Sequence, residues 1–179
     1  MSDVNLAAQP PPRLALVERL SGAVALVGGV LSLAIAALVV ISVIGRWLSG
    51  TTVGSAAGWL GPIPGDFELV QMATAISIFS FLPYCQARRG NIVVDTFTTW
   101  LSPRANAWID AFWDIVYAGM AALIATCLGT GALEHYRSGQ TTMLLQLIIW
   151  PALAICALLA LTLAWAALTT ATARIRGRP

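Results

Sequence analysis

The chain has 179 residues, of which 58% are hydrophobic and only 10% are charged, and its net charge is +2 at pH 7. Soluble domains carry about 25% charged residues, so this composition excludes an ordinary soluble protein and indicates an integral membrane protein. The ten basic residues are all arginines scattered along the chain, a distribution that does not suggest a nucleic-acid-binding surface.

The first predicted span follows a polar, proline-rich segment, residues 1–19, which we expect to be a flexible tail. The uncharged run 20–45 is longer than the apolar part of a cleavable signal peptide, which has about 7 to 15 residues. It is long enough for a helix that crosses the hydrocarbon core, which takes about 20 residues. We therefore predict a permanent transmembrane helix at 20–45, ended by Arg46.

The second predicted span, 67–87, follows a connector rich in Gly, Ser, Thr and Pro. Asp66 and Glu68 stand at its start, where the free N–H groups and the macrodipole of a helix favour carboxylates. We interpret Asp66 as a cap-like residue. Glu68 lies slightly deeper and is a candidate partner for Arg46.

A segment with a one-sided apolar pattern separates the second span from the third. On a helix over 91–101, with about 100° per residue, Val93, Phe97 and Trp100 fall within one apolar arc and Asp95 falls on the other side. This pattern is typical of a helix that lies flat at the membrane interface. We predict a short interfacial amphipathic helix there, and the alternative is an ordinary loop with some buried residues.

The third predicted span, 105–131, carries Asp110 and Asp114 one turn apart on the same face. A carboxylate at the bilayer centre costs roughly 2.5 to 3.5 kcal/mol on insertion scales, and less near the ends of the helix. Both residues lie in the first turns, close in topology to several arginines. We therefore interpret them as structural ion-pairing residues rather than as a proton or cation relay.

The fourth predicted span, 142–171, follows a short polar hairpin at 134–140. The hairpin holds the only histidine, His135, for which we expect no ligand or catalytic role. Proline removes a helical donor and crowds the preceding turn, so we expect Pro151 to kink this span. A basic tail, 173–179, follows it.

The arginines predict the orientation of the four spans. The two termini and the central segment share one side of the membrane and hold eight arginines, whereas the two hairpins on the other side hold only Arg46 and Arg137. Arginine-rich segments stay in the cytoplasm, so both termini should be cytoplasmic in a multi-pass protein of the bacterial inner membrane. The eight arginines are Arg13, Arg19, Arg88, Arg89, Arg104, Arg174, Arg176 and Arg178.

Residues that membrane enzymes and cofactor proteins need are missing from the sequence. A membrane cytochrome needs paired axial histidines, and the chain has one histidine. It has no Gly-x-Ser-x-Gly turn for a serine nucleophile, and its three cysteines lack the Cys-x-x-Cys spacing of a metal site. We therefore predict no enzyme activity, no cofactor and no metal site.

Several elements follow one another in a set order: Arg46 at the end of the first span, Glu68 at the head of the second, the run 87–95, and Thr141-Thr142 ahead of a span that contains Pro151. This order resembles the small permease, or Q subunit, of the tripartite ATP-independent periplasmic (TRAP) transporters. Asn91 departs from the pattern, because that family often has histidine there.

The resemblance implies a function that depends on partners. In such systems a large permease subunit carries the substrate and sodium ions, and a soluble periplasmic binding protein captures a solute that is commonly an organic acid. The small subunit would enlarge the fixed scaffold beside the moving domain of the large one. The residues we expect to contact the large subunit or membrane lipids are Glu68, Arg88, Arg89, Asp95, Phe97 and Trp100.

Two other functions stay open from the residues alone. A stand-alone four-helix ion-coupled transporter would use Asp110 and Asp114 as its ion site. An anchoring subunit of a different membrane complex would bind partners that carry cofactors.

Overall fold

The structure is a computed structural model that describes residues 12–49, 64–88 and 102–175. These residues form four long helices, and each contains a stretch long and apolar enough to cross a membrane. The prediction of an all-α membrane protein with four spans is confirmed, whereas the interfacial helix predicted at 91–101 lies outside the described residues. The helices are α1 (Pro12–Ser49), α3 (Asp66–Ala87), α4 (Pro103–Ser138) and α5 (Trp150–Ile175).

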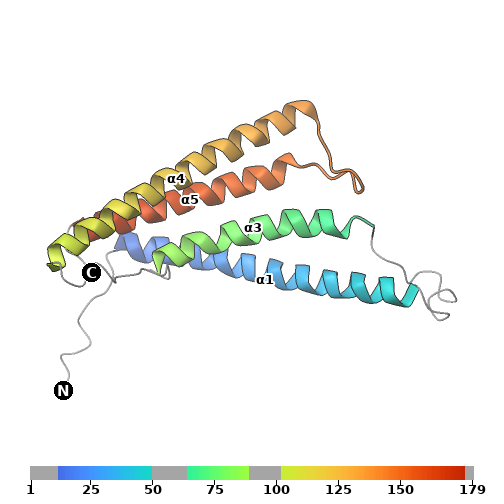
Figure 1. Cartoon of the computed structure of the whole chain (residues 1–179), viewed down its shortest axis with the longest axis horizontal. Coiled ribbons are helices and arrows are strands. Elements are labelled where there is room, and N and C mark those ends of the chain that lie inside the picture. Colours follow the sequence, from blue (N-terminus) through green and yellow to red (C-terminus); the bar gives the residue numbers. More distant parts are fainter. Residues whose placement is uncertain (1–11, 50–63, 89–101, 176–179) are drawn as a thin grey trace, which may run out of the picture.

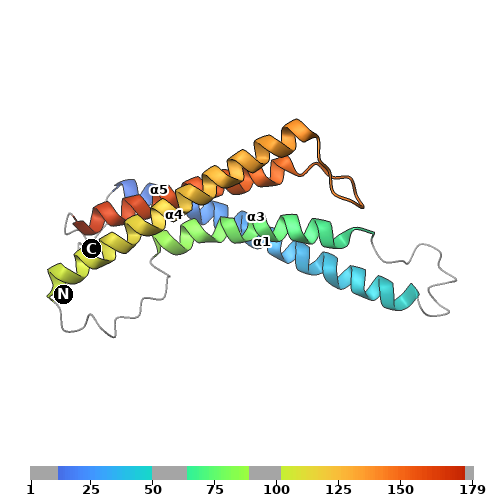
Figure 2. The same ribbon diagram turned by 45° about the horizontal axis from the view of Figure 1, so that its top comes forward.

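The helices are arranged as two antiparallel pairs, α1 with α3 and α4 with α5 (Figure 1). Contacts between α3 and α5 join the pairs, so these two helices form the centre of the bundle. The pairs converge at the end where α1 and α4 begin, and they diverge at the end where α3 and α5 begin (Figure 2). We call the first the convergent end and the second the divergent end.

Three helices are longer than the spans predicted from hydropathy. α1 begins at Pro12 rather than at residue 20, and α4 continues to Ser138 rather than ending near residue 131. Proline suits the first turn of a helix, because the N–H that it lacks has no intrahelical partner there. The length of an apolar run reflects the thickness of the hydrocarbon core, but the helix that contains it can continue into the interface.

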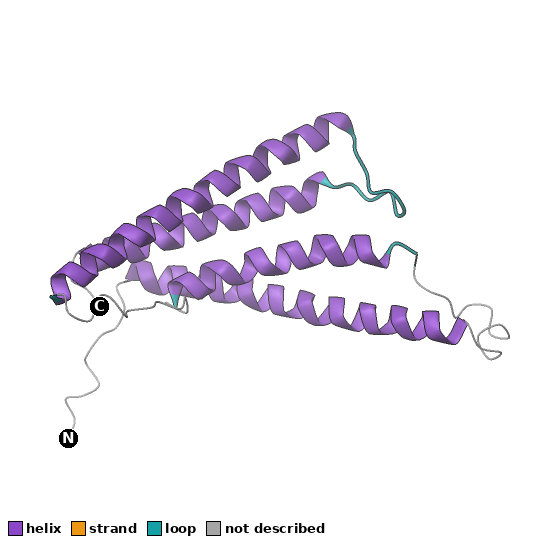
Figure 3. Cartoon of the chain, viewed as in Figure 1, coloured by secondary structure: helices purple, strands orange, loops and turns teal. Residues whose placement is uncertain are grey.

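The fourth helix differs most from its prediction. α5 begins at Trp150 instead of residue 142, so Pro151 lies in its first turn and does not kink it. The preceding residues form a loop in which Thr141 and Ile148 make an isolated antiparallel bridge (Figure 3). The first turn of a helix does not use the N–H that proline lacks, so Pro151 fits at the start of α5. We had expected it to kink the interior of a longer helix.

Helix contacts rely on small residues, while large apolar side chains face outward. At the α1–α3 contact, a Cβ on Gly28 would lie 2.7 Å from the Ser80 Cβ. Leu26 and Leu33 are 72% and 74% exposed, the reverse of a soluble core. Small residues allow close backbone approach within a membrane, where lipid covers the outward side chains.

Buried alanines dominate the helix pair α4–α5. On α4, four of them are seven residues apart, which keeps them on one stripe of the helix. Such a stripe lets the two backbones pack closely along their length. The buried alanines are Ala111, Ala118, Ala121, Ala125 and Ala132 on α4, and Ala157, Ala160, Ala164, Ala166, Ala167, Ala171 and Ala173 on α5.

Candidate functional site: polar junctions at the two ends of the bundle

Glu68 forms the main polar junction at the divergent end. Its side chain accepts hydrogen bonds from the backbone N–H groups of Leu144 (2.9 Å) and Leu145 (3.0 Å), one to each carboxylate oxygen. Glu68 is only 6% exposed and lies in the first turn of α3, whereas the two donors belong to the loop before α5. The carboxylate therefore fastens this loop to the start of α3, and we call this contact the Glu68 clamp.

The loop is shaped to present those two N–H groups. Thr142 accepts a hydrogen bond from the Leu147 N–H through its hydroxyl (3.0 Å) and donates its own N–H to the Leu147 carbonyl (2.9 Å). Gln146, between the donors and Leu147, has a φ of 51°, which non-glycine residues seldom adopt. These bonds close a tight turn whose outer N–H groups point to Glu68.

Gly65 makes the second contact that holds the loop against the start of α3. Its φ is 75°, and a Cβ at this position would lie 2.5 Å from the Leu145 Cγ. A glycine is needed here both for its left-handed conformation and for the close approach of Leu145. The start of α3 thus holds the loop through the Glu68 carboxylate and through the surface of Gly65.

Asp66 ties the end of α1 to the start of α3. The Arg46 guanidinium lies 3.6 Å from its carboxylate, and the buried Ser42 hydroxyl donates a hydrogen bond to it. The pairing of Glu68 with Arg46 that we considered from the sequence is therefore wrong. Asp66 is nearer to α1, whereas Glu68 is on the side of α3 that faces the loop.

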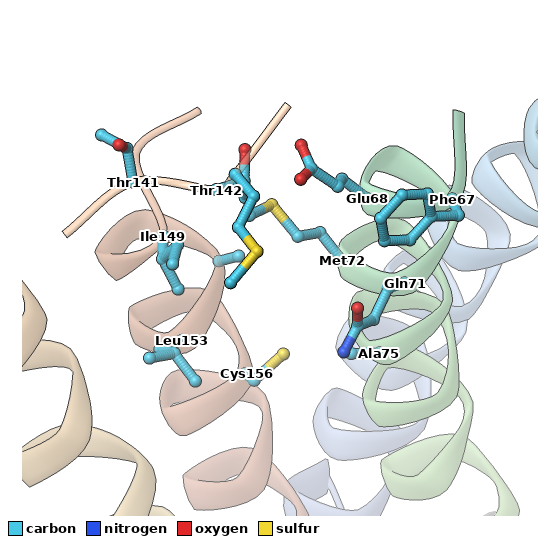
Figure 4. Close-up of a pocket in the computed structure, with 12 residues that line it drawn as sticks. Phe67, Glu68, Gln71, Met72, Ala75, Thr141, Thr142, Ile149, Leu153 and Cys156 are labelled. Atoms are coloured by element: carbon cyan, nitrogen blue, oxygen red, sulfur yellow. The ribbon is translucent and has the colours of Figure 1, made fainter. Parts of the chain in front are cut away.

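A cleft of about 440 Å³ lies below the clamp, between α3 and α5. Figure 4 shows Glu68 and Thr142 at the loop end of this cleft, with Leu153 and Cys156 on the α5 wall. The cleft is lined by Phe67, Glu68, Gln71, Met72, Ala75, Thr141, Thr142, Met143, Ile149, Ala152, Leu153 and Cys156.

At the convergent end, Arg88 joins α3 to α1. Its Nε lies 3.0 Å from the Glu18 carboxylate and donates a hydrogen bond to the Tyr84 hydroxyl at 3.2 Å. The Tyr84 hydroxyl, and then the Glu18 charge, raise the pKa of Arg88 above its usual value. The Arg88 side chain is 60% exposed, so it also remains available to groups at the membrane surface.

Gln86 forms a second junction at this end and connects three helices. Its amide nitrogen donates hydrogen bonds to the Asp114 carboxylate of α4 (2.9 Å) and to the Thr170 hydroxyl of α5 (3.2 Å). Gln86 is only 4% exposed, so these bonds satisfy a polar group that would be costly to bury alone. The convergent end is thereby held by a buried polar network.

Some of the residues predicted to act in binding lie at these two junctions, and the others lie outside the described residues. Glu68 and Arg88 lie at opposite ends of the bundle, so they belong to different contacts. The ion pairing predicted for Asp110 and Asp114 stays a prediction, although Gln86 contacts the second of them. The remaining predicted residues, Arg89, Asp95, Phe97 and Trp100, lie outside the described residues.

Sequence reasoning missed several residues that build the junctions. Gln86 and Thr170 are ordinary polar residues near helix ends, and Glu18 lies within the segment that we predicted to be a flexible tail. Only their positions in three dimensions reveal them. Thr142 did carry a signal, because it stands in the element that resembles the start of the family's last helix.

Exposed aromatic residues mark two interfacial levels along the bundle. Trp108 and Trp113 are 65% and 63% exposed near the start of α4, and Tyr136, near its end, is 63% exposed. At 1.5 Å per residue, Trp113 and Tyr136 are about 35 Å apart along α4, close to the thickness of a hydrocarbon core. Aromatic belts at this spacing, with four apolar helices between them, define a multi-pass membrane protein.

A scan against protein families matches residues 35–177 to the DctQ component of the tripartite ATP-independent periplasmic transporters. The match covers most of the chain, so the chain belongs to this family of small TRAP-transporter membrane components. The resemblance drawn from the sequence is confirmed, and the family is one of transporter components rather than of enzymes. Searches of curated proteins and of solved structures found no match.

Proposed function

We propose that this chain is the fixed scaffold subunit of a sodium-coupled TRAP transporter, bound beside a large permease that takes up an organic acid from a periplasmic binding protein. The family supports the partnership, and sodium coupling and the class of solute are inferred from the resemblance. The scaffold role rests on one feature of the bundle. Its helices are tied together by polar contacts at both ends, which suits a static partner better than a moving one.

Four contacts make up this feature. At the divergent end, Asp66 ties α3 to α1 and Glu68 ties α3 to the loop before α5. At the convergent end, Arg88 ties α3 to α1 and Gln86 ties α3 to α4 and α5. A relative movement of the helices would break buried or charged contacts, which stabilise one arrangement.

The competing role of Asp110 and Asp114 as an ion site in a stand-alone transporter receives less support. Asp114 accepts a hydrogen bond from the buried Gln86, as a structural carboxylate would. Among the described residues, no three His, Cys, Asp or Glu side chains lie together in a group that could hold a metal ion.

Uptake by reconstituted vesicles tests the proposed function. We expect a tagged chain to co-purify with a large multi-span permease in about equal amounts, and vesicles that contain both to take up solute with binding protein and a sodium gradient. Vesicles that contain this chain alone should take up none. Sodium-driven uptake by the chain alone would contradict the proposal and direct attention to Asp110 and Asp114.

The interface role proposed for Arg88 and Arg89 has its own test. We expect a double substitution of both arginines to alanine to weaken assembly with the large subunit or the stability of the chain in the membrane. Arg137→Ala at the divergent end is the matched control, because it removes an exposed arginine at the other surface. Unchanged assembly, stability and uptake in the double variant would remove this part of the proposal.

We also infer that both termini are cytoplasmic, because within the described residues the convergent end carries five arginines and the divergent end carries two. Single cysteines placed at Ser49 and Ser138, both exposed at the divergent end, should react with a membrane-impermeant thiol reagent added outside the cell. A cysteine at the exposed Ser102 should react only after the membrane is opened. The reverse pattern would contradict this orientation.

A further inference from the structure

The exposed residues of α3 all lie on one side of the helix. They are spaced alternately four and three residues apart, so at about 100° per residue they fall within an arc of about 80°. This is the spacing of a stripe that packs against another helix along its length. Every other residue of α3 is at least partly buried. The exposed residues, which we call the α3 stripe, are Phe67, Gln71, Thr74, Ile78 and Phe81.

Two side chains of the α3 stripe are polar, and neither has a hydrogen-bond partner among the described residues. They are the Gln71 amide and the Thr74 hydroxyl. The other exposed threonines of the described helices donate their hydroxyl to a carbonyl of their own helix, as Thr126 does to Leu123. A glutamine amide has two N–H donors and an acceptor oxygen. The α3 stripe therefore presents unused hydrogen-bonding groups on its exposed side.

These two groups lie at a depth where lipid offers them no partner. α3 has 22 residues, so it is about 33 Å long and matches the thickness of a hydrocarbon core. Gln71 and Thr74 lie about 8 and 12 Å from its start at Asp66. Acyl chains cannot form hydrogen bonds, so polar side chains at this depth favour contact with another helix that carries such groups.

We propose that a transmembrane helix of the large permease packs along the α3 stripe and bonds Gln71 and Thr74 through its own Ser, Thr, Asn or Gln side chains. This inference rests on the proposed function and assigns the contact surface on this chain. The family supports such a partner, because DctQ is one component of a tripartite transporter. Lipid would cover the apolar residues of the stripe equally well but would leave its two polar groups without partners.

The position of α3 in the bundle suits this contact. α3 takes part in all four polar contacts that tie the ends of the bundle together. A helix bound to α3 is therefore held relative to α1, α4 and α5 at once. Phe67 and Gln71 also line the cleft between α3 and α5, on the wall shown in Figure 4, so a side chain of the partner helix has room beside Gln71.

A variant with an apolar stripe tests the proposal. Gln71→Leu combined with Thr74→Val removes the hydrogen-bonding groups of the α3 stripe but nearly keeps its shape. We expect the affinity of the tagged chain for the large subunit in detergent to fall by about tenfold, the effect of two interhelical hydrogen bonds. Thr126→Val on α4 is the matched control, because it removes an exposed hydroxyl that bonds its own helix, and it should leave the affinity unchanged.

The stability of the isolated chain separates a lost contact from misfolding. The double variant should keep the wild-type Tm when purified alone, and a fall in this Tm would overturn the proposal, because the two groups would then act within the chain. Equal affinity of the wild type and the double variant would overturn the α3 stripe and leave the proposed function in place. A wild-type chain that recovers no large subunit would overturn the proposed function and this inference with it.

Photo-crosslinking in native membranes identifies what covers the α3 stripe. A photo-crosslinking amino acid in place of Ile78, which is 53% exposed, should capture the large subunit. The same amino acid in place of Leu123, which is 57% exposed on α4, should capture mainly phospholipid. Capture of phospholipid alone at Ile78, capture of a second copy of this chain there, or equal capture of the large subunit at both positions would overturn the proposal.

Discussion

Glu68 binds mainly backbone N–H groups of the loop, and also the Thr142 side chain, which explains how one acidic residue fixes a whole loop. The loop residues Leu144 and Leu145 contribute N–H groups that any non-proline residue would supply. What the loop needs is the correct turn, which Thr142 and the positive φ of Gln146 provide. The geometry of the loop is therefore set by two of its own residues and its position by Glu68.

Glu68→Gln tests the clamp at the residue scale. A glutamine amide is neutral and has one acceptor oxygen, so one of the two loop N–H groups loses its acceptor and the other keeps only a neutral one. We expect the Tm in detergent to fall by about 2 to 4 °C or more, and proteolysis within 141–149 to become faster.

Glu134→Gln is the matched control for this experiment, because it removes an exposed carboxylate at the same end of the bundle. The control should change neither the Tm nor the proteolysis rate. Equal behaviour of the two variants would mean that the clamp contributes nothing to the stability of the loop.

At the scale of the helices, the close contact between α1 and α3 depends on Gly28 and not on its neighbour Gly29. A Cβ on Gly28 would lie 2.7 Å from the Ser80 Cβ and 3.3 Å from the Ser77 carbonyl oxygen. A Cβ on Gly29 would meet nothing within 4 Å. Both positions are therefore glycines on the same helix, but only Gly28 packs closely against α3.

Gly28→Ala should force α1 and α3 apart and destabilise the bundle by about 1 to 3 kcal/mol, as overpacking does. Gly29→Ala should be neutral or stabilise the helix by up to about 1 kcal/mol, because alanine is the better helix former. Unfolding in a mixed-micelle denaturation series measures both. A loss of stability in Gly29→Ala that matched Gly28→Ala would show that the close contact is not the cause.

The sequence predicted the elements of this fold better than their ends. Apolar runs identify spans because the hydrocarbon core requires them, but α1 begins at Pro12 and α4 ends at Ser138, where helical residues leave that core. Pro151 has a different meaning in a first turn than in a helix interior, and local sequence does not fix which applies. The apolar run thus locates a span, while capping residues outside that run, such as Ser102 and Gly139 of α4, set where the helix begins and ends.

The candidate site was predicted only in part, for a related reason. Glu68 could be recognised as an acidic residue at a helix start, but its donors lie 76 and 77 residues away and are backbone groups. Gln86 joins Thr170 across a separation of 84 residues. No sequence pattern identifies partners of this kind, whereas Thr142 could be recognised because it belonged to a family element.

At the scale of the whole molecule, the bundle is a wedge that is held at both ends. The helix pairs meet at the convergent end and separate toward the divergent end, where the loop between α4 and α5 reaches toward the start of α3 (Figure 1). A wedge fixed in this way can keep its shape while a neighbouring subunit moves. This is the property that the scaffold proposal requires.

The distance between the outer helices at the divergent end tests this property most directly. Spin labels are attached to cysteines placed at Ser49 of α1 and Ser138 of α4, in a chain whose native cysteines are replaced, and the chain is assembled with its large subunit. Pulsed electron spin resonance then measures the distance distribution with and without sodium and substrate. The account predicts one unchanged distribution in all conditions, and a second distance that grows with substrate would contradict it.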